Sequence, residues 1–137
     1  MRERSRARAW ALRVLYAWES RSDTPLEAVL AQFQTRRLIA PDRRAYLRRL
    51  VEQVAADLDG IDRALEASLT NWRLRRLTVV DRSILRMAAA EILHFDDIPP
   101  RVSIQEALAL AERYGTDQSP RFVNGVLDAL MKRVERE

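Results

Sequence analysis

Apolar residues recur at helical spacing along the whole chain, beginning with residues 2–18. At about 100° per residue, one face of this stretch collects its apolar side chains: Ala7, Ala11, Val14, Leu15 and Trp18. The other face collects Arg2, Arg6 and Arg13. The pattern therefore predicts an amphipathic first helix with one stripe for the core and one cationic stripe.

Helix-start signals divide the next part of the chain into three helices. The stretch TPLE at residues 24–27 combines an N-cap residue, a proline and the glutamate of a capping box, which predicts a helix over about 25–36. A third helix is expected to begin at the PD pair of residues 41–42. Gly60 is expected to separate it from a short fourth helix that ends near residue 69.

The same signals recur in the second half of the chain. Thr78 and Asp81 have capping-box spacing and predict a helix to about residue 93. Ser103 and Glu106 repeat that spacing after a turn at residues 97–100. Each pair therefore predicts the start of a helix.

The last helix has its own boundary residues. Gly115 is expected to end the helix before it, Ser119 to cap it and Pro120 to start it. No alternating strand pattern competes in the sequence. About seven helices with short connections predict an all-α protein, either one bundle or paired bundles.

A chain of 137 residues is expected to form a single domain, residues 1–137. It contains no cysteine, which excludes disulfides and thiolate metal sites. The N-terminus is too charged for a signal peptide, and no apolar run approaches the roughly 18 residues of a membrane span. We therefore expect a cytoplasmic protein that does not enter a membrane.

The net charge of +4 is concentrated in the first helix. Residues 1–21 contain six arginines against Glu3 and Glu19, which accounts for the whole excess. Arginines near a helix N-terminus repel one another and oppose the helix dipole, so the arrangement is costly unless an anion binds there. A second arginine cluster at residues 36–49 has a competing explanation, because all basic residues except Lys132 are arginine and clusters arise by chance.

Few side chains are suited to catalysis. His94 is the only histidine, which excludes a two-histidine metal site and disfavours a Ser-His-Asp assembly, and a helix-capping role is expected for it. Asp96 and Asp97 precede two prolines and are typical of a turn rather than of an acid/base pair. The three glycines are too scattered for a phosphate-binding loop. By elimination, we expect a binding protein without catalytic residues, metal or cofactor.

Four stretches together carry a family resemblance. They are RSRARAWALRVLYAW (4–18), ILRMAAAEIL (84–93), DIPPRVSIQEALALAERYG (97–115) and SPRFVNGVLD (119–128). In this order and spacing the chain resembles the NusB family of bacterial transcription antitermination factors along nearly its whole length. The resemblance implies an all-helical fold of two small packed bundles and no enzymatic activity.

The resemblance also implies partners. Family members bind the boxA element of nascent ribosomal RNA transcripts as single-stranded RNA, together with NusE, a small-subunit ribosomal protein. With NusA and NusG they keep RNA polymerase processive. By position, the resemblance implies RNA contacts at six residues: Arg4, Arg6, Arg8, Gln118, Ser119 and Phe122.

Several of these residues have a second explanation. The start of the last helix offers backbone N–H groups to a phosphate, and Phe122 is equally suited to stack on a base or to pack in the core. The resemblance places the NusE-facing surface at Tyr16 and Asp81, and Asp81 is also the acid of a capping box. Asn124 and Gly125 are expected to permit close helix packing.

Two alternatives to an antitermination factor stay open at this point. A NusB-like domain also precedes the catalytic domain of ribosomal RNA cytosine methyltransferases, so the chain could act as an RNA-binding module for such an enzyme. The other alternative is a helical protein that only dimerises, with its arginines solvated. A homodimer that buries the arginine-rich face is also compatible with the sequence.

Overall fold

A computed structural model describes residues 2–21, 23–35 and 39–136, so Arg36 and Arg37 of the second arginine cluster lie outside it. The described part forms α-helices and one turn of 3-10 helix, η1, and contains no strand. The elements are α1 (Arg2–Glu19), α2 (Leu26–Thr35), α3 (Pro41–Ala56), α4 (Leu58–Ser68), η1 (Leu74–Arg76), α5 (Val79–His94), α6 (Pro100–Tyr114) and α7 (Ser119–Arg136). The predicted all-α fold is therefore confirmed.

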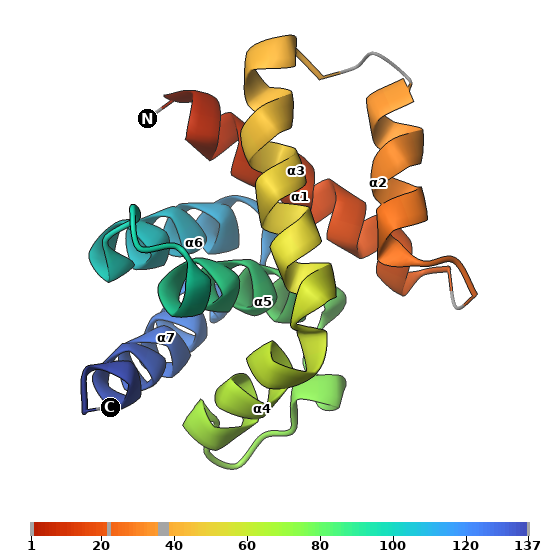
Figure 1. The fold of residues 1–137 in the computed structure, drawn as a ribbon. Helices are drawn as coiled ribbons and strands as arrows, with labels where there is room; N and C mark the ends of the chain where they lie inside the picture. The colour runs from red at the N-terminus through yellow and green to blue at the C-terminus, as the bar shows by residue number, and fades with distance from the viewer. Residues whose placement is uncertain (1, 22, 36–38, 137) are drawn as a thin grey trace.

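The helices form two small bundles that share α5 (Figure 1). Helices α1, α2 and α3 pack on one another, whereas α4, α6 and α7 pack around α5. Helix α5 also contacts α1 and α3, so it joins the two bundles. This position explains its composition: Ile84, Leu85 and residues 88–90 are all buried, because neighbours cover α5 on several sides.

Two predicted helix boundaries have the expected geometry. The Oγ1 atom of Thr78 accepts a hydrogen bond of 3.2 Å from the backbone N–H of Asp81, which makes Thr78 the N-cap of α5. Gly115 ends α6, and its N–H donates to the carbonyl of Ala111 at 2.9 Å. A Cβ atom at Gly115 would lie 2.5 Å from the Cβ of Ser119, so the close approach of α6 and α7 requires glycine here.

Two other predicted boundaries are wrong. Helix α3 ends at Ala56 and α4 begins at Leu58, so the break falls at Asp57, and Gly60 lies inside α4. Helix α6 begins at Pro100 rather than at Ser103, because the proline pair already supplies a helix start. The Ser103 hydroxyl donates instead to Glu91 Oε1 at 2.7 Å. Its tertiary partner, 12 residues earlier in the chain, overrides the local capping pattern.

The helices in the described ranges do not suit a lipid bilayer: none combines the length and the apolar character that crossing one requires.

Candidate nucleic-acid interface

The first turns of α1 separate core and surface residues as the apolar pattern predicts. Ala7 and Ala11 are buried, whereas Arg4, Arg6 and Arg13 are exposed. Arg6 has no ion pair within the described residues, and Arg13 places its guanidinium 4.7 Å from the ring centroid of Trp10. The N-terminal half of α1 therefore presents guanidinium groups to solvent beside the positive end of the helix dipole.

Arg8 does not belong to this exposed set. Only 4% of it is accessible, and its Nε and Nη1 atoms lie 2.7 Å from Glu91 Oε2 and 2.9 Å from Glu106 Oε1. Burial alone would lower the pKa of Arg8, but its hydrogen bond to Glu91 and the charge of Glu91 raise that pKa above its ordinary value. The RNA contact expected at Arg8 stays a prediction, and in the structure its guanidinium fastens α1 to α5 and α6.

Glu91 is the centre of this buried network. Besides Arg8, its carboxylate accepts hydrogen bonds from the Tyr46 hydroxyl and from Ser103. Burial and the neighbouring Glu91 raise the pKa of Tyr46, so its hydroxyl remains a donor at neutral pH. Four helices meet here, because these side chains come from α1, α3, α5 and α6. The network holds the surface arginines of α1 on a rigid base.

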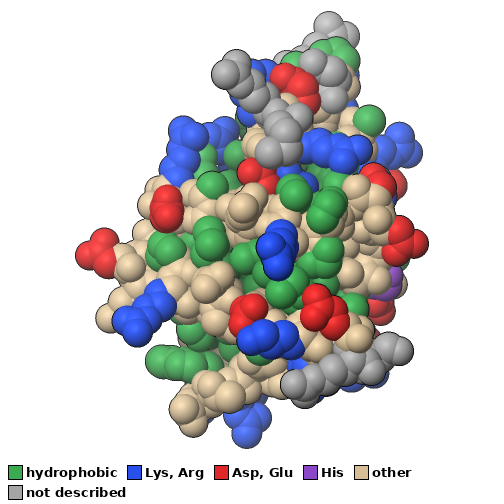
Figure 2. Space-filling model, turned by 90° about the vertical axis from the view of Figure 1, so that its left-hand side faces the viewer, with side chains coloured by type: hydrophobic (Ala, Val, Ile, Leu, Met, Phe, Trp, Pro, Cys, Tyr) green, Lys and Arg blue, Asp and Glu red, His purple; other side chains and the backbone are tan. Residues whose placement is uncertain are grey.

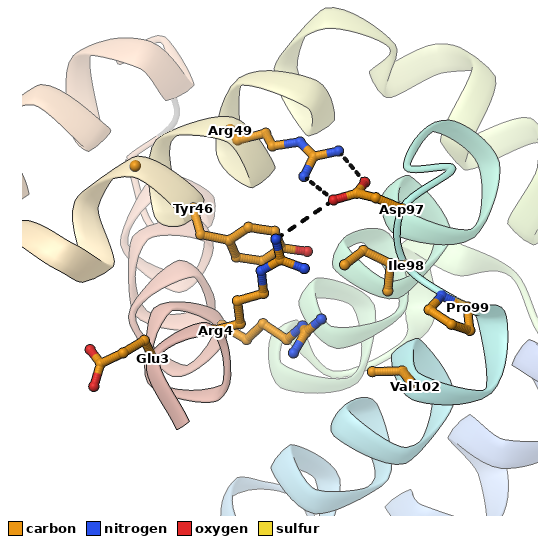
Figure 3. A pocket seen from close by; sticks show the side chains of 10 residues that line it. Glu3, Arg4, Tyr46, Arg49, Asp97, Ile98, Pro99 and Val102 are labelled. Atoms are coloured by element: carbon orange, nitrogen blue, oxygen red, sulfur yellow. Dashed lines mark hydrogen bonds and ion pairs between the residues drawn. The ribbon is translucent and has the colours of Figure 1, made fainter. Parts of the chain in front are cut away.

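A pocket of about 630 Å³ opens beside this network, between α1, α3 and the turn that precedes α6. We call it the Tyr46 pocket, and it is lined by Arg4, Arg8, Tyr46, Arg49, Asp97 and Ile98 among others. Figure 3 shows Arg49 and Arg4 reaching the same Asp97 carboxylate. Arg49 makes two hydrogen bonds to it, of 2.6 and 3.0 Å, and Arg4 Nη2 lies 3.6 Å from Oδ2. The hydrogen bonds from Arg49 hold the pKa of Asp97 at about 2.

The second arginine cluster is mostly neutralised by the fold. Arg43 pairs with Glu3 at 2.9 Å, and Arg48 pairs with Glu52 one helical turn away at 3.0 Å. Arg44 donates to the carbonyl of Ile39. For these three arginines the structure favours the compositional explanation over a dedicated basic patch. Arg49 differs, because it lines a pocket.

The start of α7 is built differently from the prediction. Thr116 acts as the cap: its Oγ1 accepts from the N–H of Gln118 at 3.3 Å. Ser119 is 1% exposed and already helical, and its hydroxyl accepts from the N–H of Thr116 at 2.9 Å. The RNA contact expected at Ser119 stays a prediction, and in the structure its hydroxyl is engaged by this internal bond. Gln118 is exposed, as a contact residue must be.

Phe122 combines the two roles that the sequence left open. It is half-buried and packs against the core, and its ring meets that of Trp72 edge to face, with 6.4 Å between centroids. Trp72 is 57% exposed and lies in the loop between α4 and η1. The sequence interpretation missed Trp72. Its signal was a tryptophan in a loop, followed at once by arginines at 73, 75 and 76.

The loop that presents Trp72 is fastened to the core. The Nη1 atom of Arg82 donates to the carbonyls of Leu74, Arg75 and Leu77, and the same guanidinium pairs with Glu19 at 2.7 Å. Leu74 is buried beneath the loop, and its N–H donates to the Glu66 carboxylate. These bonds hold the exposed indole in a fixed place.

Residues at the end of α6 lie close to the predicted RNA contacts on α1 and precede those at the start of α7. A smaller pocket of about 190 Å³ between α1 and α6 is lined by Arg6, Arg113 and Tyr114 among others. The guanidinium of Arg113 lies 5.3 Å from the ring centroid of Tyr114, just before the Gly115 turn into α7. Figure 2 shows the side of the molecule on the left of Figure 1. There, Lys and Arg side chains lie apart from one another around exposed hydrophobic groups. On this face, cations and hydrophobic side chains are therefore interspersed rather than gathered in one basic patch.

Comparison with known proteins establishes the family. The family model described as NusB family matches residues 5–132. The chain belongs to the NusB family. The transcription antitermination protein NusB of Sorangium cellulosum (strain So ce56) is 40% identical over 136 residues, or 99% of this chain and 96% of that protein. The NusB of Chloroherpeton thalassium (strain ATCC 35110 / GB-78) is 36% identical over 96% of this chain, which spans 63% of that longer protein.

Solved NusB structures share the fold. T. maritima NusB has a TM-score of 0.85 and 38% identity over 94% of this chain and 90% of that one. A chain in the crystal structure of antitermination factors NusB and NusE in complex with dsRNA has a TM-score of 0.84 and 30% identity, over 97% of this chain and 98% of that one.

The two residues expected to face NusE are exposed to different degrees. Tyr16 is 51% exposed on α1. Asp81 is half-buried in the first turn of α5, and its Oδ1 atom is buried with no hydrogen-bond partner within the described residues. Asn124 and Gly125 contradict the prediction of close packing, since both are exposed and a Cβ at Gly125 would meet nothing within 4 Å.

Proposed function

We propose that this NusB-family protein is a transcription antitermination factor. In this proposal it binds the boxA element of nascent ribosomal RNA transcripts as single-stranded RNA, together with NusE. The complex, with NusA and NusG, keeps RNA polymerase processive, and it acts in the cytoplasm where transcripts are made. The protein contributes binding surfaces rather than chemistry. Within the described ranges, no group of His, Cys, Asp or Glu is suited to hold a metal ion.

The observation that carries the proposal is the exposed arginine pair at the start of α1. Arg4 and Arg6 lie where the helix dipole is already positive, and Arg6 has no ion pair within the described residues. Such an arrangement is unfavourable in the free protein and becomes favourable when a phosphate approaches. A nucleic-acid backbone supplies phosphates at regular spacing.

Base contacts are proposed for the other end of the same surface. The exposed Trp72 and the half-buried Phe122 form an edge-to-face pair beside the start of α7, and Gln118 is exposed nearby in sequence. Aromatic rings of this kind stack on unpaired bases without demanding a particular sequence. Arg113 and Tyr114 line a pocket with Arg6 and stand at the end of α6, just before α7, which supports one continuous strand contact.

NusE is proposed to bind elsewhere on the protein, at the surface that includes Tyr16 and Asp81. The exposed phenol of Tyr16 is the kind of aromatic side chain that is enriched at protein interfaces. Asp81 is half-buried in the first turn of α5, so part of its side chain is open to a partner.

The proposal predicts different effects of a charge change and a ring change on binding of labelled boxA RNA. Arg6→Glu should weaken binding by at least about tenfold and flatten the log–log salt slope by roughly 0.7 for each phosphate that is no longer neutralised. Trp72→Ala should weaken it by about tenfold, within the range for base stacking, and leave the slope unchanged. Fluorescence anisotropy at two or more salt concentrations measures both quantities.

Two exposed residues outside this surface provide matched controls. Arg133→Glu makes the same charge change near the far end of α7, and Tyr16→Ala removes the other strongly exposed aromatic ring. Neither should alter RNA affinity. Binding by Arg6→Glu within about threefold of the unmodified protein, a difference below roughly 1 kcal/mol, would refute the RNA surface on α1.

A further inference from the structure

The proposed RNA contacts on the surface of α1 do not use the Tyr46 pocket, which is also lined by α3 and by the turn before α6. The pocket volume of about 630 Å³ lies within the range of sites that enclose small ligands. We propose that it takes up one nucleotide unit of the bound RNA strand, with the phosphate between Arg4 and Arg49, where the Asp97 carboxylate lies in the free protein. This inference rests on the proposed RNA-binding function and extends it to α3.

The Asp97 carboxylate accepts hydrogen bonds from Arg49 with the geometry that a phosphate would adopt. The two oxygens of Asp97 accept from Nη1 and Nη2 of Arg49 at 3.0 and 2.6 Å, and Arg4 approaches the same group from α1 (Figure 3). Two parallel N–H···O bonds are the fork geometry by which arginine binds both carboxylates and phosphates. Asp97 is the sole ion-pair partner of Arg4 and of Arg49 in the described part of the chain. Displacement of this one side chain therefore leaves both guanidinium groups without an ion-pair partner, while Arg49 still lies 3.8 Å from the ring centroid of Phe95.

The rest of the pocket offers a surface for the sugar or base. The Tyr46 ring, Ile98, Pro99 and Val102 form an apolar wall next to the two arginines. The Tyr46 hydroxyl is fixed by Glu91, so the ring is held in one orientation. Arg8 also lines the pocket, and its buried Nη2 atom has no hydrogen-bond partner within the described residues. The pocket therefore joins a fixed aromatic ring and an apolar wall to the two arginines.

Asp97 is free to leave. Its side chain is 48% exposed and stands in the turn before α6, so it can rotate into solvent when a backbone phosphate of the RNA arrives. The carboxylate therefore competes with RNA for Arg4 and Arg49. Removing its charge should strengthen RNA binding, whereas removing Arg49 should weaken it. A residue that only stabilised the turn would not have these opposite effects.

The test compares four variants of the full chain in the RNA anisotropy measurement. Arg49→Gln should weaken boxA RNA binding by about tenfold and flatten the salt slope by roughly 0.7, the value for one phosphate on a single strand. Asp97→Asn should strengthen binding by about threefold or more. The neighbours provide controls: Arg48→Gln removes an arginine that pairs within α3, and Asp96→Asn removes an exposed acid of the same turn. Both should bind as the unmodified protein does, and thermal melts should show that all four variants fold.

The outcomes separate this inference from the proposed function. Loss of RNA binding in Arg6→Glu, with no change in Arg49→Gln or Asp97→Asn, would overturn the pocket and leave the function standing. Weaker binding by Asp97→Asn would likewise overturn it, since Asp97 would then position Arg49 rather than compete. Absence of RNA binding by the unmodified protein would overturn both. Adenosine monophosphate is a further probe. If it binds through Arg49 without competing with RNA, the pocket is a site for a free nucleotide, and the proposal that it holds part of the RNA strand is refuted.

Discussion

At the scale of single residues, Arg8 shows how a charged side chain can belong to the core. It stands three residues before Ala11 and seven before Leu15, both buried, so helical spacing places it on the apolar face of α1. Its partner Glu91 follows three buried alanines in α5, 83 residues further along the chain. Spacing separates Arg6 from this face, but Arg4, seven residues before Ala11, shares the face of Arg8. The partner of Arg8 was not predictable from sequence, because nothing local links the two helices.

Arg8→Gln should destabilise the protein by about 3–5 kcal/mol, because it leaves the buried charge of Glu91 without its cation. Urea denaturation followed by circular dichroism measures this loss. Arg48→Gln is the control: it breaks an exposed pair and should change the free energy of unfolding by at most about 0.5 kcal/mol. An Arg8→Gln protein that is as stable as the unmodified one, yet does not bind RNA, would return Arg8 to the RNA surface.

At the scale of elements, a predicted helix boundary holds where the expected local bond forms and fails where the capping serine has another partner. The cap at Thr78 and the helix end at Gly115 depend on atoms within four residues, and both are confirmed. Ser103 and Ser119 were expected to cap helices from their residue type and spacing. Ser103 instead serves Glu91 in another helix, and the cap of α7 is Thr116. Residue type and spacing do not reveal which serine has a competing partner.

The loop that carries Trp72 depends on a charge network between α1, α4 and α5. Glu19 accepts from Arg82 and Arg86, and Arg86 also binds Asp62. The hydrogen bond from Arg82 lowers the pKa of Glu19 below its ordinary value of 4.5, although burial opposes the shift. Since the folded state favours the charged carboxylate, Glu19 stabilises the fold above about pH 4.5, and this contribution is lost as the pH falls through its folded pKa.

Comparison of Glu19→Gln with the unmodified protein checks this pH dependence. The variant should be less stable at pH 7, and the difference in free energy of unfolding should shrink as the pH is lowered from 4.5 toward 3. Urea midpoints at several pH values give that difference directly. A difference of constant size over the whole range would mean that packing of the side chain, and not its charge, supports the loop.

At the scale of the whole molecule, α5 joins the two bundles, and two separate surfaces of the protein are proposed to bind RNA and NusE. The arginines of α1 and the Trp72–Phe122 pair belong to the proposed RNA surface, and Tyr16 and Asp81 to the proposed NusE surface. The order of helices was predictable from amphipathic periodicity, and the two-bundle fold was implied by the family resemblance. The Tyr46 pocket and the Trp72 loop were not, since each forms only when segments far apart in the chain meet.

Binding of labelled boxA RNA and of a scrambled RNA, with and without purified NusE and at two salt concentrations, distinguishes an antitermination factor from a general polyanion binder. We predict a preference for boxA that strengthens when NusE is present, and an affinity that falls with salt as phosphate contacts require. Equal, salt-sensitive binding of both RNAs that NusE does not change would contradict the proposed function. The arginines would then form a general polyanion surface on a NusB fold.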